Sequence, residues 1–94
     1  MAAQAQPTVQ IDNERTRVTE WRFAPGAATG FHTHEFDYVV VPLTSGQLRA
    51  VDGNGAETTA ELISGLSYFR QAGVAHNVVN DSPHEFVFVE IEYK

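Results

Sequence analysis

The sequence predicts an all-β fold, either a sandwich of two sheets or a small barrel. Short runs rich in β-branched and aromatic residues alternate with turn signals made of Gly, Pro, Asn and Ser. No segment repeats its apolar residues at the spacing of three to four positions that an amphipathic helix requires. A chain of 94 residues can bury one modest core, and we therefore expect a single domain.

Seven strand-like runs follow a polar lead-in. Residues 1–10, rich in Ala and Gln, are expected to form a flexible lead-in, and residues 11–94 the folded domain. The expected strands span 18–23, 31–43, 48–51, 57–63, 67–70, 76–79 and 85–93. These runs are separated by turn signals, among them Pro25-Gly26, Ser45-Gly46 and Asn80-Asp81-Ser82-Pro83. Short strands separated by regularly spaced turns are typical of sandwiches and small barrels.

The last run carries apolar side chains on both faces, over Phe86-Val87-Phe88-Val89. A strand has this pattern when both of its faces are covered. The core of the domain would cover one face. The other could be covered within a closed sandwich or by a second subunit, so a homodimer is expected as one of two interpretations. Glu90 and Glu92 follow on one strand face and are expected to be solvated.

The charge and the cysteine count exclude several classes of function. Six Lys and Arg residues against twelve Asp and Glu residues give a net charge of −6, which disfavours nucleic acids and anionic membranes as partners. The chain has no cysteine, so a metal ion would need His, carboxylate or Tyr ligands. We see no secretion signal and no apolar run long enough to span a bilayer, and we expect a cytoplasmic protein.

Two of the four histidines stand two positions apart in a strand-like run. His32 and His34 should point to the same face, about 6.5–7 Å apart at the backbone. Two imidazoles at this spacing can converge on one ion, at about 2.0–2.1 Å from each nitrogen if the ion is zinc. Two unrelated surface histidines on one strand face would give the same pattern, so the spacing alone leaves both interpretations open.

Two longer motifs resemble the paired signatures of the cupin superfamily. The first signature, Gly-x5-His-x-His-x3/4-Glu-x6-Gly, is carried here by Gly26, His32, His34 and Gly46, and the second, Gly-x5-Pro-x-Gly-x2-His-x3-Asn, by Gly65, Gly73, His76 and Asn80. The resemblance implies a double-stranded β-helix, or jelly-roll barrel, that is usually dimeric and holds one metal ion inside. It implies His32, His34 and His76 as the metal ligands. A cupin that has lost its metal is the alternative.

The carboxylate ligand of the first signature is missing. Counting forward from His34 places it at Tyr38, and counting back from Gly46 places it at Val39. The disagreement suggests a bulge, for which Pro42 is a suitable residue. A bulge before position 37 could instead turn Asp37 inward, so either Asp37 or Tyr38 could replace the missing Glu. Tyr38 is also the candidate catalytic residue, as a hydrogen-bond or proton donor, unless it is a core tyrosine.

Three neutral imidazoles leave the full charge of a divalent ion in place, which favours an anionic ligand. Some cupins with a similar ligand set, including diketone-cleaving and thiol dioxygenases, use three histidines on iron. We therefore expect a metal-binding small cupin, holding iron, zinc, nickel or manganese, that binds or converts a small anionic organic molecule. A three-His Fe(II) dioxygenase is one form of this function. A non-catalytic binding or sensor protein and a metal-free structural barrel are the alternatives.

Two segments, 37–42 and 88–92, are similar to small cupins of β-alanine degradation. Neither segment indicates which reaction the protein would catalyse. Arg22 and Arg70 could reach an anionic ligand, or they could pair with acidic groups at the surface.

Overall fold

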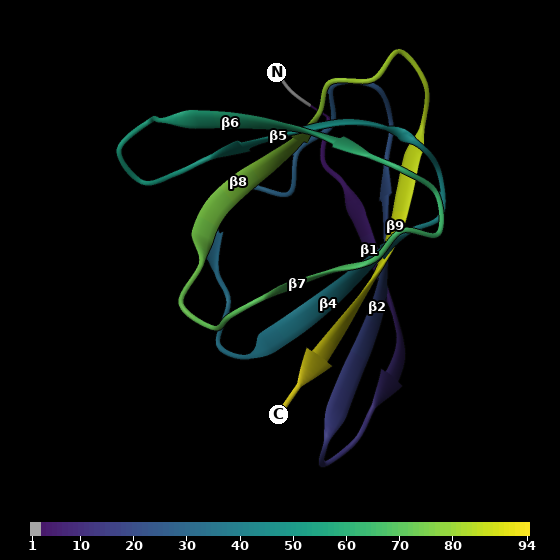
Figure 1. Ribbon diagram of the computed structural model, residues 1–94, viewed down its shortest axis with the longest axis vertical. Helices are drawn as coiled ribbons and strands as arrows, with labels where there is room; N and C mark the ends of the chain where they lie inside the picture. The colour runs from purple at the N-terminus through teal and green to yellow at the C-terminus, as the bar shows by residue number, and fades with distance from the viewer. Residues whose placement is uncertain (1–2) are drawn as a thin grey trace.

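The computed structural model describes residues 3–94, which form two antiparallel β-sheets packed face to face (Figure 1). The strands are β1 (Gln6–Asp12), β2 (Thr16–Phe23), β3 (His32–Thr33), β4 (Asp37–Pro42), β5 (Gly46–Val51), β6 (Glu57–Leu62), β7 (Tyr68–Arg70), β8 (Ala75–Asn80) and β9 (Phe86–Tyr93). The all-β prediction is confirmed for these residues. Within them no helix is long and apolar enough to cross a membrane.

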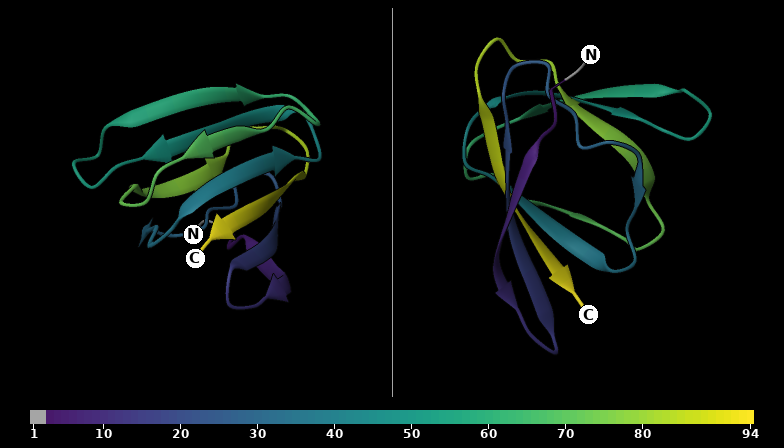
Figure 2. Two further views of the ribbon diagram at one scale, coloured as in Figure 1. Left: turned by 60° about the horizontal axis from the view of Figure 1, so that its bottom comes forward. Right: turned by 180° about the vertical axis from the view of Figure 1, so that it is seen from behind.

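The two sheets have the crossed connectivity of a jelly roll. One sheet has the strand order β1-β2-β9-β4-β7, and the other has the order β3-β8-β5-β6. Strand β9 therefore lies in the middle of the larger sheet, between β2 and β4. Phe86, Val87 and Phe88 of this strand are buried, whereas Val89 is half-buried. The views in Figure 2 show the two sheets as twisted layers, with the β1–β2 hairpin projecting at the end where the C-terminus lies.

The expected strand over residues 31–43 is in fact two strands in different sheets. Strand β3 pairs with β8, whereas β4 pairs with β9 and β7. The chain passes from one sheet to the other over residues 34–36. The interruption suggested at Pro42 is wrong, because β4 stays in register with β9 as far as Pro42 opposite Phe88. Pro42 ends the strand, where a missing N–H donor interrupts the hydrogen-bond ladder least.

Strand β1 begins at Gln6, inside the segment expected to be a flexible lead-in. It pairs with β2 from Gln6 opposite Arg22 to Asp12 opposite Arg17, with a register shift between Val9 and Ile11. All seven of its residues are exposed. An edge strand without a buried face shows no alternation of apolar and polar residues, so the sequence pattern did not reveal it.

The core changes from apolar to polar along the paired strands β2 and β9. Phe23 lies opposite Phe86, and Trp21 lies opposite Phe88. The rings of Phe23 and Phe88 have centroids 5.5 Å apart, and both side chains are buried. Burying such a side chain contributes about 1.5–3 kcal/mol. Further along the same face come polar pairs, so this end of the barrel interior can hold a chemical site.

Candidate metal centre

Three histidines meet inside the barrel. His32 on β3 lies directly opposite His76 on β8, and His34 follows just beyond the end of β3. The Nε2 atom of His34 is 3.1 Å from that of His32 and 3.2 Å from that of His76. His34 is buried, and the other two are half-buried. The structure therefore brings together all three residues that the sequence suggested as ligands.

The backbone around His34 is held by the turn that precedes β8. The His34 N–H donates to the carbonyl of Val74 at 2.8 Å, and the Gly73 N–H donates to the carbonyl of His34 at 2.8 Å. Gly73 has a φ of +99°, a conformation that side-chain-bearing residues rarely adopt. The second signature therefore contributes His76 as a candidate ligand. It also contributes the turn at Gly73, whose backbone hydrogen bonds hold His34 of the first signature in place.

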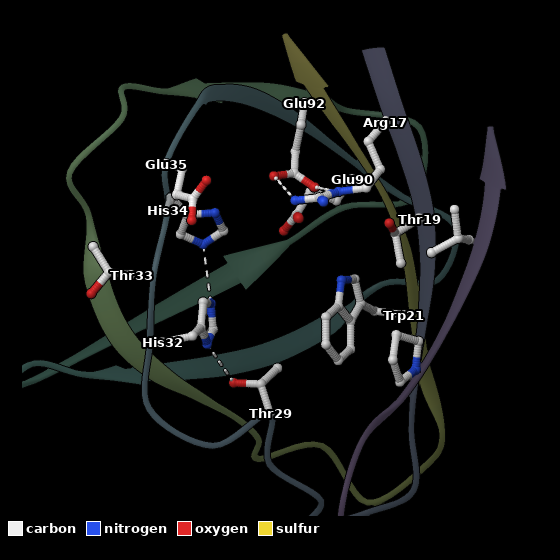
Figure 3. A pocket seen from close by; sticks show the side chains of 12 residues that line it. Arg17, Thr19, Trp21, Thr29, His32, Thr33, His34, Glu35, Glu90 and Glu92 are labelled. Atoms are coloured by element: carbon white, nitrogen blue, oxygen red, sulfur yellow. Dashed lines mark hydrogen bonds and ion pairs between the residues drawn. The ribbon is translucent and has the colours of Figure 1, made fainter. Parts of the chain in front are cut away.

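The hydrogen bonds of His32 determine where its lone pair points. Its Nδ1 atom lies 2.9 Å from the carbonyl oxygen of Gly30. A carbonyl can only accept a hydrogen bond, so Nδ1 is the donor, and the Nε2 atom is the one that can present a lone pair. This Nε2 atom points at the ring of His34 (Figure 3), and a nitrogen of His76 lies within 4.8 Å of both rings. Metal-binding histidines commonly have this arrangement, with the far nitrogen donating to a carbonyl or carboxylate.

The electrostatics of the cluster keep two of the rings neutral. Burial, followed by the nearby charge of His32, lowers the pKa of His34 and of His76 to about 4. Both are therefore unprotonated at neutral pH, as a metal ligand must be. Two nitrogens bound to one ion at about 2.0–2.1 Å lie about 2.8–3.4 Å apart, for angles between 90° and tetrahedral. The observed 3.1 and 3.2 Å fit this range.

Tyr38 lies against the cluster, as expected, although the parity argument assumed one continuous strand and the chain changes sheet over residues 34–36. Its ring stacks on that of His34, with centroids 3.9 Å apart and planes inclined by 17°. Only 3% of Tyr38 is exposed, and burial raises the pKa of its phenol to about 12. The phenol therefore keeps its proton and can act as a hydrogen-bond donor.

Asp37 does not replace the missing carboxylate. Its side chain is exposed, and its Oδ1 atom accepts the N–H of Ala72 at 2.8 Å. The possibility that Asp37 turns inward is therefore wrong. The chain breaks over residues 34–36, before β4 begins, so β4 runs regularly and alternation places Asp37 on the face opposite Tyr38.

Two buried carboxyl groups lie beside the cluster and were not predicted. Glu90 and Glu92 are only 8% and 5% exposed, so the expectation of a solvated pair is wrong. Because side chains alternate along a strand, both share the inward face of β9 with Phe86 and Phe88. That parity was visible in the sequence and could have identified them. Arg17, across on β2, binds Glu92 through two hydrogen bonds of 2.8 and 2.9 Å.

Glu90 is the less compensated of the two carboxyl groups. Burial, followed by the charge of Glu92, raises its pKa to about 7, and Arg17 lowers it by a smaller amount. The ligand atoms of His34, Glu90 and Glu92 all lie within 4.8 Å of one another. His34 is therefore shared by a cluster of three histidines and a cluster with two carboxylates.

Two cavities flank these groups. The first, called here the carboxylate cavity, has a volume of about 350 Å³ and is lined by residues that include Trp21, His32, His34, Glu90 and Glu92 (Figure 3). The second, called here the tyrosine cavity, has a volume of about 450 Å³. Its lining includes Tyr38, Tyr68 and Arg70, with apolar residues of β5, β6 and β8.

The two arginines suggested as anion contacts differ in their surroundings. Arg22 is exposed and pairs with Glu20 and Glu85, as a surface arginine would. Arg70 is exposed as well, and it lines the tyrosine cavity. His84 is exposed and lies outside the cluster of three histidines.

Comparison with known proteins identifies the family. No protein-family model matches the chain. The β-alanine degradation protein BauB of Pseudomonas aeruginosa is 60% identical over 91 residues, which are 97% of this chain and 95% of the relative. A crystal structure of a cupin domain from Bordetella pertussis is 57% identical, with a TM-score of 0.96 over 100% of this chain and 97% of that one. A double-stranded β-helix protein from Klebsiella pneumoniae, 24% identical with a TM-score of 0.78, covers 96% of this chain and 76% of that one and shares the fold. The chain belongs to the cupin family.

Proposed function

We propose that His32, His34 and His76 hold a divalent metal ion, and that the protein binds or converts a small organic anion beside it. The observation that carries this proposal is the convergence of the three Nε2 atoms at 3.1 and 3.2 Å, with the Nε2 atom of His32 directed toward the ring of His34. Iron, zinc, nickel and manganese all accept imidazole ligands. Such an ion, when bound, supplies a Lewis acid that polarises an oxygen of the ligand.

The charges around the cluster support an anionic ligand. The three imidazoles are neutral ligands and remove none of the charge of the ion. Glu92 is compensated by Arg17, so the buried carboxyl group that can offset part of this charge is Glu90, while Glu35 lines the same cavity but is exposed. An ion bound here would keep a net positive charge, which attracts carboxylates and enolates.

Side chains beside the cluster would orient that ligand. Tyr38 stacks on His34 and offers a protonated phenol as a hydrogen-bond donor. Trp21 lines the carboxylate cavity and provides an apolar surface for the carbon skeleton of the ligand. We assign Tyr38 as the candidate catalytic residue because its ring stacks on that of His34 and its phenol keeps a proton to donate.

The name of the relative from Pseudomonas aeruginosa supports a substrate class. That protein is named for β-alanine degradation, and β-alanine is a three-carbon carboxylic acid. We propose that this chain acts on β-alanine or on a small carboxylate derived from it. An oxidative reaction at iron is the form of activity to test first, because three protein ligands leave room for both a substrate and oxygen.

The metal content of the purified protein tests the proposal. Wild type and the H34A variant are each reconstituted with iron(II), zinc, nickel or manganese, dialysed and analysed by mass spectrometry of the elements. H84A is the matched control, because His84 is exposed and lies outside the cluster. We expect about one ion per chain in wild type and H84A, and loss of the ion in H34A.

Equal metal content in H34A and H84A, or no uptake in any protein, would overturn the metal centre. Oxygen uptake by the iron form with β-alanine and other small carboxylates then tests turnover. Saturable binding of a carboxylate without oxygen uptake would support a binding or sensor protein in place of a dioxygenase.

A further inference from the structure

Glu90 is a buried acidic residue to which the protein gives no basic partner. The buried acidic side chains of residues 3–94 are Glu90 and Glu92, which are 8% and 5% exposed. Arg17 forms an ion pair with Glu92, whereas no Lys or Arg within residues 3–94 forms one with Glu90. Buried charged groups are normally paired with another charge or bound to a ligand. The carboxyl group of Glu90 is therefore available to a molecule that enters the barrel.

Glu90 lines the carboxylate cavity, and so do His32 and His34. Figure 3 shows the carboxyl group of Glu90 between His34 on one side and Trp21 on the other. A ligand atom of His34 lies within 4.8 Å of an oxygen of Glu90. A molecule only a few bonds long can therefore contact both the carboxyl group of Glu90 and an ion held by the histidines.

The side chains around Glu90 suit a small organic cation. Thr19 lies directly opposite Glu90 on the neighbouring strand and lines the same cavity, so its hydroxyl can accept an N–H hydrogen bond. Trp21, two positions further along β2, also lines the cavity and offers an aromatic ring, which attracts cations. An ammonium group has three N–H donors, so a carboxylate, a hydroxyl and an indole ring together can bind it.

A second metal ion fits this position less well than an ammonium group does. The ligand atoms of His34, Glu90 and Glu92 lie close enough together to hold an ion. Both carboxyl oxygens of Glu92, however, already accept hydrogen bonds from Arg17, at 2.8 and 2.9 Å. A divalent ion would have to take Glu92 from Arg17 and would be repelled by the guanidinium charge. An ammonium group needs only Glu90 and leaves the ion pair of Arg17 and Glu92 intact.

We infer that Glu90 binds the ammonium group of a short amino acid whose carboxylate is bound at the three-histidine centre. The inference rests on the function proposed above and narrows its substrate class. A ligand of this class keeps its amine, which stays protonated and does not bind the ion. β-Alanine itself therefore fits the cavity, whereas a deaminated carboxylate derived from it would leave Glu90 without a partner.

Calorimetric titration of the metal-loaded protein with β-alanine and with propanoate tests the inference. Propanoate has the same carbon chain and carboxylate but no amine. The E90Q variant removes the charge of Glu90 and keeps the size of its side chain, and E35Q is the matched control, because Glu35 lines the same cavity but is exposed. We expect wild type and E35Q to bind β-alanine about 10–100-fold more tightly than propanoate, and E90Q to lose this preference.

Equal affinity of wild type for β-alanine and propanoate would overturn the inference, as would an equal loss of the preference in E90Q and E35Q. A preference for β-alanine that persists in E90Q would place the amine on the ion and would also overturn it. So would a metal content of E90Q as low as that of H34A, because Glu90 would then be a ligand of the ion.

A further probe separates this site from the metal centre. Propylammonium carries the amine without a carboxylate, so its binding at Glu90 does not require an ion. If wild type holds no metal, propylammonium is titrated against the metal-free protein. Binding that E90Q weakens would keep the Glu90 site while the proposed function fails. Binding that E90Q leaves unchanged, or no binding to wild type, would remove both.

Discussion

Replacing Glu90 with glutamine removes a buried carboxyl group whose ionised form is disfavoured in the fold. Glu90 is 8% exposed, and burial, followed by the charge of Glu92, raises its pKa from the ordinary 4.5 to about 7. A carboxyl group whose pKa is raised in the folded state contributes stability that is fully present below the unfolded pKa of 4.5. That stability is lost as the pH rises through 7.

The size of the effect follows from the same values. The rise from 4.5 to about 7 corresponds to about 3 kcal/mol, at about 1.36 kcal/mol for each pH unit. Glutamine is nearly the same size and carries no charge, so E90Q should not lose this stability. We therefore expect E90Q and wild type to have similar free energies of unfolding at pH 4.5. Above pH 7, E90Q should be more stable by up to about 3 kcal/mol.

Urea unfolding of the metal-free protein, followed by the fluorescence of its single tryptophan, measures this difference at a series of pH values. The protonation of His34 and His76 also changes the free energy of unfolding with pH. It does so in both proteins, so this contribution cancels in the difference between E90Q and wild type. E85Q is the matched control, because Glu85 is exposed and paired with Arg22. A difference between E90Q and wild type that stays constant from pH 4.5 to 8 would refute the reasoning.

Two further substitutions test the geometry around the site. G73A should lower the free energy of unfolding by about 1–3 kcal/mol and weaken metal uptake at His34, because alanine is strained at a φ of +99°. Urea unfolding measures the loss, and G53A should change stability by less than about 0.5 kcal/mol, because Gly53 has no positive φ and its nearest contact is 3.6 Å away. R17M should cost about 1–2 kcal/mol at pH 7 by leaving Glu92 buried without its partner, and E92Q in the same chain should recover part of that loss. A double-mutant cycle in which the two changes add independently would contradict this pairing.

The sequence predicted the histidine centre more completely than the carboxylates beside it. His32 and His34 share one strand face by parity, and the resemblance to cupins added His76, which lies directly opposite His32. Glu90 and Glu92 were assigned to solvent because charged residues near the end of a chain are usually exposed. Their burial depends on β9 being a central strand, and that position is set by pairing with β2 and β4.

The break between β3 and β4 shows a second limit of sequence patterns. Residues 31–43 read as one continuous strand because aromatic and β-branched residues occur throughout the run. The change of sheet over residues 34–36 is set by long-range pairing of β3 with β8 and of β4 with β9, and no local signal marks it. The homodimer stays a prediction, and light scattering of the purified protein would measure the oligomeric state.

The position of the site follows from a gradient along β2 and β9. At one end of this strand pair the interior is filled by Phe23 and Phe86, and at the other end by the ion pair of Arg17 and Glu92. The apolar end supplies the burial that stabilises the barrel, so the polar end can contain groups that contribute little to stability. The three histidines and Tyr38 lie near this polar end of the interior. There a ligand atom of His34 is within 4.8 Å of one of Glu92, and the ring of Tyr38 stacks on that of His34. A small barrel of 94 residues can in this way place polar, metal-binding types of side chain beside its core without losing its fold.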